Sequence, residues 1–117
     1  MMYTIQSQPK SVSVVCLKGS PNVYELDELK STLNSILNKV RHKNKLILDF
    51  SQLINMDELA LGVFVAFSKN YRAGGGELRL AGLNRTVRNL FDYAQLSKVY
   101  EICDSAADAQ RSFIEKR

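Results

Sequence analysis

The chain has 117 residues, of which 45% are apolar and 24% are charged, and sixteen basic against twelve acidic residues give a net charge of +4. This composition predicts one globular domain over residues 1–117, with its own hydrophobic core. It excludes a disordered, collagen-like or low-complexity chain. The basic residues are spread along the chain rather than clustered, so nucleic-acid binding is not expected.

Membrane and metal sites also have little support in the sequence. The longest apolar stretch, Leu59 to Phe67, is about half of the roughly 20 residues that a membrane span needs. The N-terminal residues are polar and unlike a signal peptide. Cys16 and Cys103 each lie in a strand-like run, which is typical of reduced, buried thiols, and His42 is a lone histidine. We therefore expect a cytoplasmic protein with no membrane span, no metal and no cofactor.

Residue patterning in the first half predicts strands, then a helix, then a strand. Alternation of apolar and polar residues indicates a hairpin of two strands, 2–7 and 11–18, with a turn at Pro9 and Lys10. Apolar residues at helical spacing then predict an amphipathic helix from Tyr24 to about Arg41.

The run 46–50 that follows is short and mostly apolar, as in a central parallel strand, and 51–55 reads as a connector. A second helix is expected from about Asp57, which is a good N-cap, to Tyr71, and Gly74–Gly76 should end it. The remaining elements are a strand at 77–81, a helix capped by Asn84, a strand at 98–102 and a helix starting at Asp104 or Ser105. The order ββαβαβαβα predicts an α/β fold: a mixed sheet of about five strands with about four helices.

The second predicted helix has two apolar faces. One face carries the large residues expected in the core together with one alanine, namely Ala60, Phe64, Phe67 and Tyr71. The other is apolar but small and carries Leu59, Gly62 and Ala66, with Val63 at its margin. Either the helix is buried on most sides, or the small face is an exposed contact surface for a partner protein. A small domain has little core to cover two faces of one helix, which favours the exposed contact surface.

The stretch around this helix resembles the STAS family, which includes bacterial anti-sigma factor antagonists. A strand ending in Asp49-Phe50 is followed by residues 56–63, Met-Asp-Glu-Leu-Ala-Leu-Gly-Val, which are similar to the family pattern Met-Asp-Ser-Ser-Gly-Leu-Gly-Val. The runs 74–78, 87–91 and 96–102 also fit the family, so the resemblance covers almost the whole chain. It implies a single-domain STAS-like fold that binds other proteins and has no enzymatic activity.

The departures from the family pattern concern its phosphorylation switch. The family's serine or threonine acceptor corresponds to Leu59, which has no hydroxyl, and the residue before it is Glu58. Asn22 stands where the family often has an aspartate in the loop after the second strand. The resemblance implies an anti-sigma factor with a kinase-type ATPase fold as partner. The residues expected to contact it are Asn22, Val23, Asp57, Glu58, Leu59, Ala60, Gly62, Val63 and Ala66.

Several alternatives stay open at this point. Without the acceptor hydroxyl, binding is either constitutive or weakened by Glu58 acting as a permanent negative charge. Asp57 is either a simple N-cap or a partner contact. Other STAS proteins dock on the ATPase of a lipid or solute transporter or serve as scaffold subunits of larger STAS assemblies, and a homodimer through the second helix is also open. An enzyme is not expected, because no paired carboxylates, phosphate-binding glycine loop or nucleophile–base pair emerges.

Overall fold

A five-stranded mixed sheet forms the centre of the protein, in the order β1-β2-β3-β4-β5. The computed structural model describes residues 2–8, 12–40 and 45–115. The strands β2 to β5 are parallel to one another, and β1 runs antiparallel to β2. The strands are β1 (Met2–Gln8), β2 (Val12–Gly19), β3 (Lys45–Leu53), β4 (Glu77–Ala81) and β5 (Glu101–Cys103). The helices are the 3₁₀-helix η1 (Val23–Glu25), α1 (Leu26–Val40), α2 (Glu58–Ala73), α3 (Arg85–Tyr93) and α4 (Ala106–Glu115).

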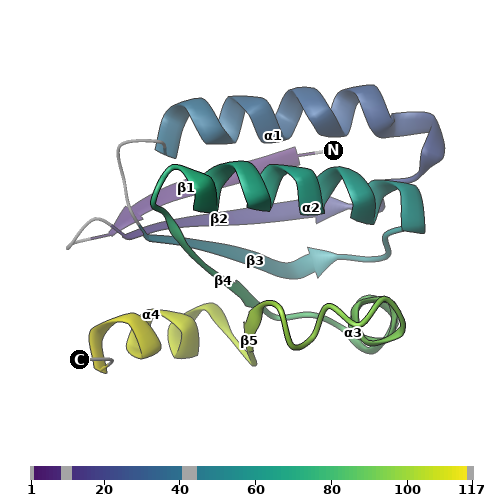
Figure 1. The fold of residues 1–117 in the computed structure, drawn as a ribbon. Helices are drawn as coiled ribbons and strands as arrows, with labels where there is room; N and C mark the ends of the chain where they lie inside the picture. Colours follow the sequence, from purple (N-terminus) through teal and green to yellow (C-terminus); the bar gives the residue numbers. More distant parts are fainter. Residues whose placement is uncertain (1, 9–11, 41–44, 116–117) are drawn as a thin grey trace.

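The helices are divided between the two faces of the sheet. In Figure 1, α1 and α2 lie over one face, while α4, in yellow, lies below the other. Successive side chains of β3 point to opposite faces of the sheet, so this strand contributes to two hydrophobic clusters. Leu48 and Phe50 belong to the larger cluster, whereas Ile47 belongs to a smaller cluster with residues of α4. Val87 and Phe91 of α3 join the larger cluster. The expected element order and mixed α/β sheet are therefore confirmed.

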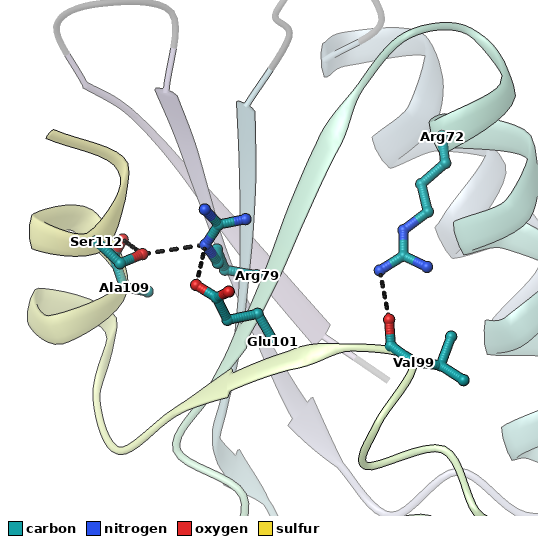
Figure 2. A network of polar contacts seen from close by, with 6 residues as sticks. All are labelled: Arg72, Arg79, Val99, Glu101, Ala109 and Ser112. Atoms are coloured by element: carbon teal, nitrogen blue, oxygen red, sulfur yellow. Dashed lines mark hydrogen bonds and ion pairs between the residues drawn. The ribbon is translucent and has the colours of Figure 1, made fainter. Parts of the chain in front are cut away.

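A buried arginine lies between β4 and α4 on the second face (Figure 2). Arg79 is 5% exposed, and its Nε lies 2.9 Å from Glu101 Oε2 and donates a 3.0 Å hydrogen bond to Ser112 Oγ. The guanidinium carbon lies 4.2 Å from the ring centroid of Phe113. Strand pairing brings Glu101 beside Arg79, so β5 and α4 are both anchored to this one side chain.

Two strand boundaries differ from the sequence-based prediction by more than one residue. The segment 51–55 is not simply a connector, because β3 continues to Leu53, which pairs with Gly19 of β2. The last strand does not begin at position 98. The amides of Val99 and Tyr100 both bond to the carbonyl of Leu96, so a turn occupies these positions and β5 starts at Glu101.

The start of α2 agrees with the prediction, whereas the helix continues two residues past the predicted end at Tyr71, to Ala73, before the glycines end it. Asp57 is its N-cap, and the amide of Gly74 bonds to the carbonyls of Asn70 and Arg72 at the C-terminal end. Gly75 has a φ of 93°, the left-handed conformation that ends many helices. A Cβ on Gly76 would lie 2.3 Å from the ring of Tyr71, so this position requires glycine for packing.

The cysteines are free but only half-buried, which corrects the expectation of buried thiols. Burial raises the pKa of both thiols; the carboxylate of Asp49 also raises that of Cys16, and Glu101 that of Cys103. The turn at 9–10 and His42 lie outside the described residues. No helix in the described ranges is long and apolar enough to cross a membrane.

Candidate functional site

The start of α2 is built around the carboxylate of Asp57. Its Oδ1 accepts a 2.9 Å hydrogen bond from the amide of Ala60, which caps the helix. Its Oδ2 accepts a 2.7 Å hydrogen bond from the amide of Val23, in the loop after β2. Asp57 is thus an N-cap that also joins two segments far apart in the sequence.

Asn22 orders the same loop from the other side. Its Oδ1 accepts a 2.9 Å hydrogen bond from the amide of Tyr24 and caps η1. The amide of Val23 is held by Asp57, so consecutive amides of this loop are bound by two different side chains. The loop therefore has a defined conformation next to the first turn of α2.

The loop between β3 and α2 is held on both sides. The amide of Ile54 donates a 2.8 Å hydrogen bond to the carbonyl of Gly19. On the other side, Asn84 Nδ2 donates to the carbonyls of Leu53 and Ile54 at 3.1 and 3.0 Å. Asn84 Oδ1 also caps α3 by accepting from the amide of Val87. Three loops at the carboxyl ends of β2, β3 and β4 are therefore tied together before any partner binds.

Four large apolar side chains project from this end of the molecule, and we call them the apolar platform: Val23, Tyr24, Ile54 and Leu59. Their exposed fractions are 44%, 93%, 71% and 57%. Exposed apolar side chains on ordered loops that are tied to one another are typical of a site of protein association. Hydrogen bonds hold the backbone of the loops beneath them, so little conformational entropy would be lost when a partner covers them.

The outer face of α2 continues this apolar surface. Leu59, Gly62 and Ala66 are exposed and Val63 is half-buried, which confirms the small second face predicted for this helix. These residues line an apolar groove of about 520 Å³ between α1 and α2. Gly62 also lines a second apolar groove of about 450 Å³, between α2 and α3.

A Cβ on Gly62 would have no atom within 4 Å. Packing within the described protein therefore does not require glycine here, although glycine lowers helix stability relative to alanine.

The structure brings together most of the residues proposed from the sequence. The side chain of Asp57 accepts from the amide of Val23, which follows Asn22 in the chain, and Glu58 and Leu59 are exposed on the first turn of α2. Ala60 is the exception. It is 0% exposed and lies in the main core, so its side chain is not on the surface.

Sequence reasoning missed three members of this site. The sequence predicts Tyr24 only as the first residue of a helix and Ile54 only as part of a connector. Asn84 was recognised as a cap, but its contact with the β3–α2 loop spans about thirty residues and has no local signal. One local feature indicates that Ile54 is exposed. It directly follows a strand and precedes the run Asn-Met-Asp, which ends in the capping residue of α2.

This end of the molecule offers apolar side chains and side-chain oxygens that cap backbone amides. The platform residue on α2, Leu59, has no hydroxyl that could accept phosphate, and the carboxylate of Asp57 is occupied by two amides. Among the described residues, no group of three or more His, Cys, Asp or Glu side chains is arranged to hold a metal ion.

Known proteins share both the sequence pattern and the fold. A model of the STAS domain matches residues 5–109. The candidate anti-sigma factor antagonist BtrV of Bordetella bronchiseptica is 25% identical over 100 residues, covering 86% of this chain and 84% of BtrV. A candidate anti-sigma factor antagonist from Thermotoga maritima has a TM-score of 0.80 at 22% identity and covers 94% of this chain and 92% of its own.

The same fold also occurs in a sulfate transporter family protein from Wolinella succinogenes. Its TM-score is 0.73 at 14% identity, with 89% of this chain and 85% of that protein covered. Similarity of fold therefore does not by itself specify the function of a protein.

Proposed function

Because the chain belongs to the STAS domain family, we propose that it is a regulatory binding protein of the anti-sigma factor antagonist type. Its partner would be an anti-sigma factor with a kinase-type ATPase fold. Binding would sequester that factor and so release a sigma factor. The contact surface would be the apolar platform together with the outer face of α2.

The observation that carries this proposal is the exposed, ordered apolar end of the molecule. Leu59 is 57% exposed beside a loop that Asp57 holds in place. A hydrophobic side chain with this exposure buries little apolar surface within the domain itself. In an interface it would bury apolar surface and stabilise the complex by an amount proportional to the area covered.

The same residue leads us to propose that binding is constitutive. Phosphorylation adds a charge of about −1.5 to −2 and three acceptor oxygens, and it needs a hydroxyl that Leu59 lacks. Glu58 offers a weaker substitute, because it carries one charge and points about 100° around the helix from Leu59. A permanently released state through Glu58 is therefore the less favoured alternative.

The first test is capture of partners by the tagged chain, followed by affinity measurement with the purified partner. We expect a kinase-fold anti-sigma factor to bind the wild type, and Leu59→Asp to weaken binding by about tenfold or more, because it places an unpaired charge in an apolar interface. Ala107→Asp is the matched control, since it adds the same carboxylate to an exposed site on α4, on the other face.

The results separate the alternatives. Equal affinity of Leu59→Asp and wild type, with the fold intact by circular dichroism, would show that the platform is not the contact surface. Purification of a transporter ATPase as the specific partner would instead favour the accessory-subunit function.

Constitutive binding is tested with Leu59→Ser. Adding ATP to the complex with an active kinase should leave the wild-type complex intact. The same treatment should phosphorylate Leu59→Ser and release it. Release of the wild type by ATP would contradict the absence of a switch.

A further inference from the structure

The two edges of the sheet are protected very differently. At one edge, β5 has only three residues, and its charged residue Glu101 is paired with Arg79. Short strands and charges are the usual means by which proteins prevent an edge from pairing with another chain. At the other edge, β1 has seven residues, and no described strand pairs with its outer side.

The sequence of β1 contains none of these protective devices. Its residues, Met-Tyr-Thr-Ile-Gln-Ser-Gln, include no charge, proline or glycine. All seven pair with β2, from Met2 opposite Lys18 to Gln8 opposite Val12, without a register shift. A bulge, which could twist the edge away from a partner, is therefore absent from this strand pair.

We propose that β1 is a homodimer interface, in which two copies pair their β1 strands antiparallel and extend the sheet across the dimer. Antiparallel pairing of a strand with itself is two-fold symmetric, as closed dimers require. Centring the pairing on Ile5 gives every residue of β1 a partner. It places Ile5 opposite Ile5, and Thr4 opposite Gln6, of the second copy.

The charge pattern favours a second copy as the occupant. In self-pairing, any charge near the centre of the strand would meet a like charge close by, which destabilises a sheet. The absence of charge from all seven positions removes this penalty. The paired edge would bond the N–H and C=O groups on the outer side of β1, and the residues of the apolar platform lie outside the paired strand.

The register makes the proposal testable with two matched double variants. In Thr4→Lys/Gln6→Lys, each new lysine faces a lysine of the other copy, and we expect the dimer to weaken by about tenfold or more. In Thr4→Lys/Gln6→Glu, each lysine faces a glutamate at the same two positions, and we expect affinity to return to within a few-fold of wild type. Sedimentation velocity over a concentration series measures both.

Three results would overturn the proposal: a wild type that stays monomeric at high micromolar concentration, two double variants that dimerise equally well, or two folded variants that are both monomeric. Hydrogen exchange of the wild type is an independent measurement that needs no substitution. Exchange of the amides in residues 2–8 should slow as concentration rises, and concentration-independent exchange there would also contradict the interface.

Discussion

The two faces of the sheet are stabilised by different chemistry. The face under α1, α2 and α3 holds a cluster of aromatic rings in which Phe64 contacts Phe50, Phe91 and Tyr100, with centroids 5.6 to 6.0 Å apart. The face under α4 holds a smaller cluster that includes Ala81 and Ala109, with a charged arginine beside it. One face is a large apolar core, whereas the other is a thin layer that depends partly on polar contacts.

The difference shows where the fold is weakest. Burying apolar rings stabilises the folded state in proportion to the area removed from water. Burying the guanidinium of Arg79 costs free energy unless its donors are satisfied, and Nη2 has no hydrogen-bond partner among the described residues. We therefore expect the attachment of α4 to contribute less net stability than the packing of α1 and α2.

The largest expected loss of stability comes from a substitution in the aromatic cluster on the first face. Phe64→Ala removes a side chain that is 1% exposed and contacts four other aromatic residues, and should lower the free energy of unfolding by about 3–5 kcal/mol. Phe113→Ala on the second face, where the ring is 8% exposed in a smaller cluster, should cost clearly less. Urea denaturation measures both, and equal losses would contradict the difference between the faces.

A smaller effect is expected at the buried arginine. Glu101→Leu leaves Arg79 buried without its countercharge and should cost about 2 kcal/mol, reduced from the fully buried case because Glu101 is half-exposed. Arg79→Met removes the buried charge and keeps an apolar contact with Phe113, so it should cost less than about 1 kcal/mol. A thermal denaturation series in which Arg79→Met is the more damaging variant would show that the ion pair itself provides the stability.

The last effect is a pH dependence that appears only at high pH and is confined to the first face. Burial, together with the carboxylate of Glu77, raises the pKa of Tyr71 to about 12, against about 10 in an unfolded chain. Ionisation is thus easier after unfolding, so this contribution to stability is complete below pH 10 and is lost as the pH rises from about 10 through 12. Tyr71→Phe should lose less stability than wild type over that range in urea titrations. Parallel losses would exclude Tyr71 as the source.

The helical pattern of α2 was sufficient to predict most of the candidate site. Spacing alone separated Phe64 and Tyr71, which are buried, from Leu59 and Gly62, which are exposed. It also placed Ala60 in the core, although the family motif had suggested a partner contact there. Helical periodicity tells which way a side chain points, whereas similarity to a motif does not.

The rest of the site could not be predicted, because it depends on contacts between distant loops. Tyr24 and Ile54 belong to the apolar platform only because parallel pairing brings the carboxyl ends of β2 and β3 together. The second role of Asn84 needs β4 to lie beside β3. Likewise, nothing local in the alternating run of β4 distinguishes Arg79 from an exposed arginine.

By itself, the sequence determined the order of strands and helices, the caps at Asp57 and Asn84, and the absence of a hydroxyl at Leu59, because each depends on residue type and on neighbours within a few positions. Only the tertiary structure decided that Asp57 also holds Val23, that Arg79 is buried under α4, and that β1 is left as an uncharged edge. The physical reason is that periodicity specifies which face of an element is apolar. The neighbour that covers that face is selected by sheet pairing across dozens of residues.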